Sequence, residues 1–265
     1  ERNMRGIDSE SNNDAAPALQ YSNRVMFNVL ANITKIALNA KSLDPQPEHR
    51  FSWLWANNAV INSSIGFFSG QDICGGCTNL TVRPAAQMVV NNLFVASSVA
   101  HVAGVVVFDP RFGPLDNSHN DIDYNLYWNP PAKLALPPVE RFCTGYQPFS
   151  PGHDGNCTSF EEWRAVTGKD AHSLDQLDPL LGGEQVSHSA DRWETPFLPH
   201  ASSPLRGRGV ALTKSDKGVT GPSHDIGGQS LLDSANSPSI GAFVVPHSSG
   251  SIRSGKKTRK TAGEP

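Results

Sequence analysis

Acidic residues gather between Asp109 and Asp123, and an arginine and a histidine lie among them. The candidates for catalysis in this stretch are Asp109, Arg111, His119, Asp121 and Asp123, with Asp116 beside them. Asp121 and Asp123 are two positions apart, so in a β-strand both carboxyl groups lie on one face, about 7 Å apart. Carboxyl pairs about 5–10 Å apart act as acid, base or nucleophile in the hydrolysis of glycosidic bonds. A base beside a cation such as Arg111 would instead suit proton abstraction that gives an enolate-like intermediate.

Structural roles compete with these chemical ones. An Asp-rich loop is commonly solvated or turn-forming, and it can also supply ligands for Ca²⁺. His101 lies inside an apolar stretch, where a packed or hydrogen-bonded core histidine is the default expectation. We expect Asp170, His172 and Asp178 to serve in caps and turns. No cofactor and no metal site is predicted, and Ca²⁺ is the ion that the acidic loop would suit.

The four cysteines are Cys74, Cys77, Cys143 and Cys157. The first two have the Cys-x-x-Cys spacing of redox motifs, but such motifs begin a helix in a βαβ unit, and the surrounding sequence does not predict one. A zinc site would need all four to converge. Disulfides are therefore favoured, with Cys143–Cys157 as the first pair and Cys74–Cys77 as the second. The cross pairings Cys74–Cys143 and Cys77–Cys157 remain open.

Four Asn-x-Ser/Thr sequons predict glycosylation, at Asn32, Asn62, Asn79 and Asn156. Together with an even number of cysteines they favour an oxidising, secretory context, so we expect a secreted protein. The net charge of −3 gives no field that would attract nucleic acid or an anionic membrane. No run of about 18 apolar residues predicts a transmembrane helix. We expect a monomer without nucleic-acid or membrane partners.

An internal repeat predicts the architecture. Asn28, Asn58, Asn92 and Asn125 recur at separations of 30, 34 and 33 residues, and a short apolar run follows each of them. The runs have the length and the β-branched and aromatic content of strands. One such coil cannot bury its apolar face alone, so stacked coils must share a core. Asparagine suits the turn between strands, and its side chains can form a ladder along the stack.

The pattern changes after Trp128. Ser159 to Gly168 predicts one short helix, with Ser159 as the N-cap and Gly168 as the stop. Gly, Ser, Lys and Arg dominate the last residues, which are typical of a disordered tail. The predicted organisation is β-helix coils over 1–145, an end module over 146–247 and a disordered basic tail over 248–265.

The order of motifs resembles the C-terminal end of right-handed parallel β-helix proteins of the pectate-lyase-like superfamily. The shared motifs are Tyr124 to Trp128, Trp163 to Ser173, Asp178-Pro179, Ser203-Pro204 with Gly207 or Gly209, and Asp225 to Gly228. The resemblance covers roughly residues 85–245. It implies an all-β fold, a right-handed parallel β-helix (solenoid) with a short α-helix in the C-terminal module. Lyases, glycoside hydrolases, epimerases and surface proteins share this end, so it implies no single reaction.

Two functions are consistent with these features. The first is a secreted carbohydrate-active β-helix, a polysaccharide lyase or glycoside hydrolase, whose groove would hold paired carboxylates or an Asp/His/Arg cluster. The alternative is a non-catalytic secreted β-helix for polysaccharide binding, adhesion or cell-wall structure, whose groove would hold aromatic and amide side chains. In both cases a polysaccharide is the expected partner, and whether the chain is an enzyme stays open.

Overall fold

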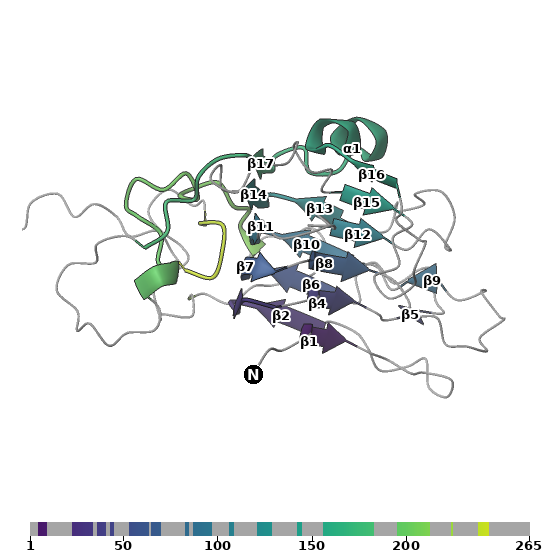
Figure 1. The fold of residues 1–265 in the computed structure, drawn as a ribbon, viewed down its shortest axis with the longest axis horizontal. Helices are drawn as coiled ribbons and strands as arrows, with labels where there is room; N and C mark the ends of the chain where they lie inside the picture. The colour runs from purple at the N-terminus through teal and green to yellow at the C-terminus, as the bar shows by residue number, and fades with distance from the viewer. Residues whose placement is uncertain are drawn as a thin grey trace, which may run out of the picture.

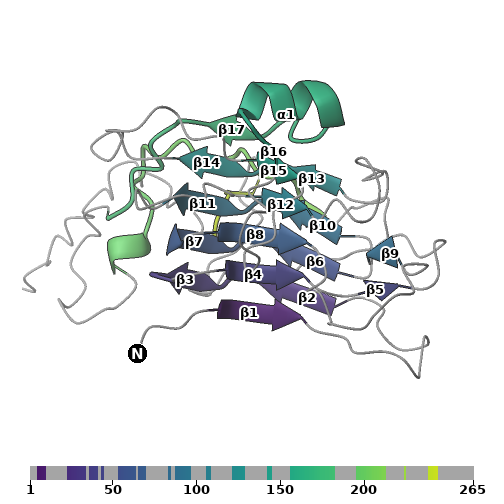
Figure 2. The same ribbon diagram turned by 45° about the vertical axis from the view of Figure 1, so that its right-hand side comes forward.

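The structure is a computed structural model, and the residues that it describes are 5–9, 23–33, 36–40, 43–44, 53–63, 65–69, 83–84, 87–96, 106–108, 121–128, 142–144, 156–182, 195–212, 224 and 238–243. They form mostly β-strands in parallel sheets, with one short α-helix, so the described part of the chain is all-β in class. Figures 1 and 2 show the strands stacked in layers, with the helix across one end of the stack.

Three sheets contain most of the strands. Sheet A consists of β1 (Arg5–Ser9), β4 (Ile36–Ala40), β8 (Ile65–Ser69), β12 (Val106–Phe108), β15 (Phe142–Thr144) and β16 (Asn156–Thr158). Sheet B consists of β2 (Asn23–Met26), β6 (Trp53–Ala56), β10 (Gln87–Val90) and β13 (Asp121–Asp123). Sheet C consists of β3 (Val29–Ala31), β7 (Ala59–Ser63), β11 (Leu93–Ala96), β14 (Leu126–Trp128) and β17 (Leu174–Asp175).

The remaining elements are few. Strands β5 (Leu43–Asp44) and β9 (Arg83–Pro84) form a small antiparallel pair. The α-helix, α1, runs over Phe160–Thr167, and a 3₁₀ turn, η4, runs over Thr195–Phe197. Within sheets A, B and C the pairings are parallel except for β15 with β16, which is antiparallel.

The chain passes through the three sheets in a fixed order. Strands β2, β3 and β4 lie in sheets B, C and A, and the sets β6–β7–β8, β10–β11–β12 and β13–β14–β15 repeat that order. We call each such set a coil. Each strand pairs in parallel with the strand at the same place in the next coil, as β3 does with β7 and β7 with β11. Residues about 30–34 positions apart therefore become neighbours, as the repeat predicted.

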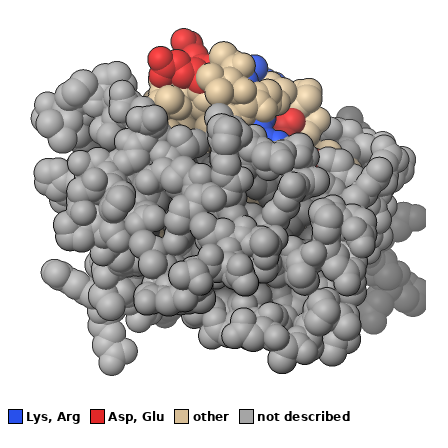
Figure 3. Space-filling view, turned by 90° about the vertical axis from the view of Figure 1, so that its right-hand side faces the viewer, with Lys and Arg blue, Asp and Glu red and all other residues tan. Residues whose placement is uncertain are grey.

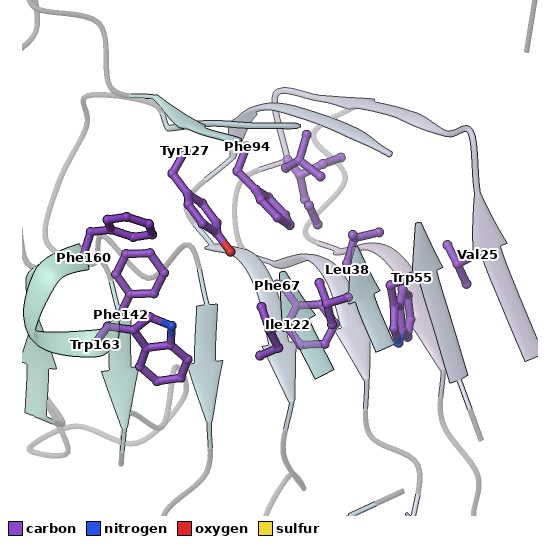
Figure 4. Packing of buried hydrophobic residues seen from close by; sticks show 14 residues of the cluster. Val25, Leu38, Trp55, Phe67, Phe94, Ile122, Tyr127, Phe142, Phe160 and Trp163 are labelled. Atoms are coloured by element: carbon purple, nitrogen blue, oxygen red, sulfur yellow. The ribbon is translucent and has the colours of Figure 1, made fainter. Parts of the chain in front are cut away.

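Apolar side chains from all three sheets meet in one core (Figure 4). The aligned buried positions are Trp55, Val89 and Ile122 in sheet B, Val60, Phe94 and Tyr127 in sheet C, and Leu38, Phe67 and Phe142 in sheet A. The rings of Phe94 and Tyr127 stack with centroids 5.5 Å apart. Burying one such large side chain contributes about 1.5–3 kcal/mol. Those of the inner coils are covered by the coils on either side, and Tyr127 and Phe142 of the last coil are covered by α1.

The turn from sheet B to sheet C has the same two-residue form in each coil. Its first residue is left-handed, with φ between 53° and 58° at Phe27, Asn57, Asn91 and Tyr124. Its second residue is the repeated asparagine. A left-handed conformation is uncommon for an aromatic residue, so something must hold this turn in place.

A ladder of side-chain amides holds these turns. The Nδ2 of Asn28 donates to the Oδ1 of Asn58 at 2.9 Å, and Asn58 donates to Asn92 at 2.9 Å. Asn92 donates in turn to Asn125 at 3.1 Å. Each Oδ1 also accepts the backbone N–H of the asparagine in the preceding coil, at 2.9 to 3.1 Å. The ladder therefore satisfies the buried polar groups of every turn that it passes through.

Helix α1 closes the end of the core. Ser159 and Glu162 form a reciprocal capping box at its start, and Gly168, with φ of 66°, ends it. Both ends therefore agree with the helix that the sequence predicts. Phe160 and Trp163 are buried, and the ring of Trp163 stacks on Phe142 with centroids 5.4 Å apart. The helix thus covers the last coil with aromatic rings, as Figure 4 shows.

Two C-terminal segments, 203–212 and 238–243, lie against the outer faces of sheets B and C. Leu205 and Ile240 pack with Leu93 of sheet C, and Leu212 packs with Leu54 and Met88 of sheet B. These outer positions are buried beneath the segments. Where the two segments lie, the outer faces of sheets B and C are therefore apolar and covered by the chain itself, whereas Arg24, Asp121 and Asp123 on the outer face of sheet B keep exposed surface.

Asparagine side chains hold the segments through the backbone. The Oδ1 of Asn91 accepts the N–H of Val210 and its Nδ2 donates to the carbonyl of Val210, both at 2.8 Å. Asn57 donates to the carbonyl of Ser239 at 3.1 Å. A Cβ on Gly209 would lie 2.9 Å from the carbonyl oxygen of Pro238, so the close approach of the two segments requires glycine there.

Candidate functional site

Two of the predicted catalytic residues lie in the described part of the chain. Asp121 and Asp123 are the ends of β13, and both are half-buried while Ile122 between them is buried. This alternation agrees with two carboxyls on one face of a strand. Asp109, Arg111, His119 and Asp116 lie outside the described residues, as do His101 and Asp225.

Asp123 is joined to a histidine that the sequence did not single out as catalytic. Its Oδ2 lies 2.7 Å from the Nδ1 of His172, and its Oδ1 accepts the backbone N–H of His172 at 2.7 Å. Oδ1 also accepts the backbone N–H of Tyr124 at 2.8 Å. The carboxylate therefore holds the His172 segment at two points, and its bond to Tyr124 fixes its own orientation.

The imidazole of His172 is open to solvent on its other side. The His172 side chain is 62% exposed, while that of Asp123 is 16% exposed. The ring of Tyr124 stacks on the imidazole, with centroids 4.7 Å apart and planes 5° apart. A histidine whose Nδ1–H donates to a carboxylate has Nε2 as its acceptor, which is the arrangement of an oriented general base.

A cation on α1 contacts the segment that carries His172. The guanidinium of Arg164, on α1, donates to the carbonyl of Ala171 at 3.3 Å, one residue before His172. Its Cζ also lies 5.4 Å from the centroid of the Phe160 ring, which is a cation–π contact that orients the guanidinium. Figure 3 shows both acidic and basic side chains on the end of the molecule that carries α1.

A buried carboxyl group holds the segment that carries His172 in position. Asp170 is fully buried and accepts from the hydroxyl of Tyr127 at 2.9 Å and from the indole Nε1 of Trp163 at 2.8 Å. The hydroxyl of Ser173 donates to it at 2.6 Å, and the amide of Asn125 reaches it at 3.5 Å. We call Asp170 with these four donors the Asp170 hub.

The hub ends the asparagine ladder. The Oγ of Ser173 accepts the backbone N–H of Asn125 at 2.8 Å, which is the bond that each ladder asparagine makes to the coil before it. Leu174 likewise donates its N–H to the carbonyl of Asn125, as Leu126 does to Asn92. Ser173 therefore occupies the next ladder position, and the residues between Asp170 and Ser173, His172 among them, are held from both sides.

Ionisation at the hub is shifted by burial. Loss of hydration raises the pKa of Asp170 to about 6, although the hydrogen bonds from Ser173, Trp163, Tyr127 and Asn125 act in the opposite direction. Burial, followed by the charge of Asp170, raises the pKa of Tyr127 well above its usual value. Tyr127 therefore keeps its proton and stays a donor to the carboxyl group.

We predict that Asp170 makes the protein more stable at mildly acidic pH. Its pKa is higher in the folded chain than the 3.8 of a free side chain, so the folded state binds more protons between pH 4 and 6. Its contribution to the free energy of unfolding is full below that window and falls by about 3 kcal/mol as the pH rises through it. The difference in unfolding free energy between the wild type and Asp170→Asn, measured by denaturant titration at pH 4, 5, 6 and 7, should shrink by that amount. A difference that is flat across the four pH values would contradict this assignment.

The predicted glycosylation sites are described in part. Asn32 and Asn62 are exposed and left-handed; Asn32 follows β3, and Asn62 lies at the equivalent position near the end of β7. The Nδ2 of Asn62 donates to the Oδ1 of Asn32. Asn156 lies on β16, and Asn79 falls outside the described residues. Their glycosylation remains a prediction.

Within the described ranges no group of three or more His, Cys, Asp or Glu side chains could hold a metal ion. In the same ranges no helix is long and apolar enough to span a membrane. Cys74, Cys77 and the basic tail 248–265 lie outside them.

Signals for His172 in the sequence are weak, because it contacts Asp123 across 49 positions. The sequence would have placed His172 beside Asp123 only if Ser173 had been identified as the ladder residue that follows Asn125. No protein-family model matches the chain, and no curated protein matches its sequence.

Proposed function

We propose that the chain is a right-handed parallel β-helix that is secreted and acts on a polysaccharide, with proton abstraction as its chemistry. The parallel stacking of coils that visit sheets B, C and A in order supports the β-helix. The sequons and the even number of cysteines support secretion. The contact of Asp123 with the exposed His172 carries the proposal for the chemistry.

A lyase fits this site better than a hydrolase that uses Asp121 and Asp123 as its pair. Both oxygens of Asp123 are already engaged by hydrogen-bond donors, so this carboxylate suits an orienting role rather than proton transfer to a glycosidic oxygen. Among the described residues none is seen to hydrogen-bond the Nε2 of His172, and Arg164 brings a positive charge to the same segment. A base with a nearby cation is what abstraction of a proton next to a carboxylate requires.

Replacing His172 by alanine tests this role. We expect kcat to fall by about 10²–10⁴-fold on a polysaccharide that the wild type cleaves, because a general base contributes about that much. The substitution should leave thermal unfolding nearly unchanged, since the side chain is 62% exposed. The measurement is ultraviolet absorbance of the unsaturated lyase product together with reducing ends, over a panel of anionic and neutral polysaccharides.

His200→Ala is the matched control, because His200 is also exposed and, within the described part of the chain, its side chain has one polar contact, with Ser202 at 3.5 Å. Free imidazole should restore part of the activity of His172→Ala and none to Asp123→Asn, in which the ring has lost its orienting carboxylate. Reducing ends without absorbance would show hydrolysis and overturn the proposed chemistry. Equal activity of His172→Ala and the wild type would remove His172 from the mechanism.

A non-catalytic β-helix for polysaccharide binding, adhesion or cell-wall structure is the second candidate. It is favoured by the parts of sheets B and C that segments 203–212 and 238–243 cover, since the apolar side chains there contact the chain itself and not a substrate. It predicts neither ultraviolet absorbance nor new reducing ends, together with retained binding to a polysaccharide. A pull-down on insoluble polysaccharide, combined with the two cleavage assays, separates the candidates: binding with cleavage supports the enzyme, and binding without cleavage supports the binding protein.

A further inference from the structure

Strands β15 and β16 bring two cysteines to opposite positions. The pairing is antiparallel, and its register sets Phe142 opposite Thr158, Cys143 opposite Cys157, and Thr144 opposite Asn156. Residues directly opposite each other on antiparallel strands have Cα atoms about 4.5–5.5 Å apart and lie on the same face of the sheet. Cysteines joined in a disulfide have Cα atoms about 4.4–6.8 Å apart.

We propose that Cys143 and Cys157 form a cross-strand disulfide that fastens the end of the molecule. The register selects this pair among the pairings that the sequence leaves open, because it brings the two positions together without any change of the backbone. The inference concerns the fold alone and is independent of the proposed polysaccharide chemistry.

The bond would join the last coil to the segment that covers it. Strand β15 is in the last coil and contributes Phe142 to the core. Strand β16 leads directly into Ser159 and α1, whose Phe160 and Trp163 pack on Phe142. A crosslink between the two strands therefore keeps α1, and the His172 segment after it, on the end of the coils.

Within the described part of the chain, few other contacts hold β16 in place. Strand β16 has three residues, and sheet A gives it one neighbour, β15. The hydroxyl of Thr158 donates to the carbonyl of Phe142 at 3.4 Å, which is a long hydrogen bond. A short edge strand of this kind gains most from a covalent link, because the link limits the freedom of the unfolded loop between Thr144 and Asn156.

Formation of the bond is a two-electron oxidation. The thiols of Cys143 and Cys157 lose two electrons and two protons, and one S–S bond forms. Glutathione disulfide accepts the electrons and protons and becomes two molecules of glutathione. The secretory context that the sequons indicate supplies an oxidant of this class.

Peptide mapping of the full chain tests the proposal. The protein is refolded with a glutathione redox pair, its remaining thiols are alkylated at low pH, and it is digested without reduction. We expect one crosslinked peptide that contains Cys143 and Cys157, and that reductant separates. A crosslink from Cys143 to Cys74 or Cys77, or alkylation of Cys143 in the refolded protein, would overturn the proposal.

Thermal unfolding gives a second readout. Reductant should lower the Tm of the wild type by about 6–12 °C, as expected for a loop of this length. It should lower the Tm of Cys74→Ser/Cys77→Ser by nearly the same amount, and that of Cys143→Ser/Cys157→Ser by much less, because the loop between Cys74 and Cys77 is short. The proposal is wrong if reductant shifts the Tm of Cys143→Ser/Cys157→Ser as much as that of the wild type.

Discussion

Replacing Asn92 by alanine is expected to lower the free energy of unfolding by about 4 kcal/mol. Asn92 is fully buried, and its Oδ1 accepts from both the backbone and the side chain of Asn58. Its Nδ2 donates to the carbonyl of Trp55 and to Asn125. Alanine leaves several of these buried groups without a partner, and each orphaned group costs about 1–3 kcal/mol. Denaturant titration at neutral pH measures the loss.

Asn28 provides the matched control within the same ladder. It occupies the same turn position and donates to Asn58, but it is half-buried, so water can replace what alanine removes. We expect Asn28→Ala to cost about 1 kcal/mol. Asn62→Ala, at an exposed turn, should cost less still. If all three substitutions cost the same, burial of the ladder would not be what makes its central rungs important.

Removing the acceptor at the Asp170 hub is the second large effect. Asp170→Ala leaves the hydroxyls of Tyr127 and Ser173 and the indole N–H of Trp163 buried without their acceptor. At pH 5, where most Asp170 carboxyls are neutral, we expect a loss of about 4 kcal/mol in the free energy of unfolding. At pH 7 the loss should be smaller, because alanine also relieves the cost of a buried charge.

Asp178→Ala is the control for the hub. Asp178 is exposed and accepts the backbone N–H of Leu180 at 2.8 Å, so its removal exposes the donor to water and should cost less than about 1 kcal/mol. Near-ultraviolet circular dichroism adds a second readout, since Trp163 and Tyr127 both contact the Asp170 carboxyl. An Asp170→Ala variant as stable as Asp178→Ala, with an unchanged aromatic signal, would contradict the role of the hub.

The repeat was readable in the sequence because one residue type recurs where the backbone needs it. Asparagine tolerates a tight turn and carries both a donor and an acceptor, so the ladder requires the same residue type at this position of each coil. The short apolar runs after it predicted the strands of sheet C. The helix could be predicted because Ser159, Glu162 and Gly168 act locally, within the helix and its caps.

Contacts that a side chain makes with the backbone of another segment could not be predicted from the sequence of that segment. Asn91 binds the N–H and the carbonyl of Val210, which any residue but proline presents, so the sequence around Val210 does not reveal where it docks. The expectation of a cap or turn role for His172 rested on its place in the end module that resembles those of β-helix proteins. Its pairing with Asp123 depends on which strand β17 follows in the stack, and short strands of two or three residues carry little register information.

The ladder also determines how such a chain can change its length. Its asparagines are 30, 34 and 33 residues apart, yet the hydrogen bonds between them are alike. The ladder therefore requires one asparagine in each coil, whatever the number of residues in the longer connections between strands. Insertions and deletions in the connections that follow the strands of sheets C and A should be tolerated in evolution and in engineering. A single residue added to the two-residue turn between β10 and β11 would instead separate Asn92 from both of its neighbours. Because each rung offers its neighbour the same donor and acceptor, a duplicated coil could be spliced between two existing ones, and the chain would lengthen in whole coils.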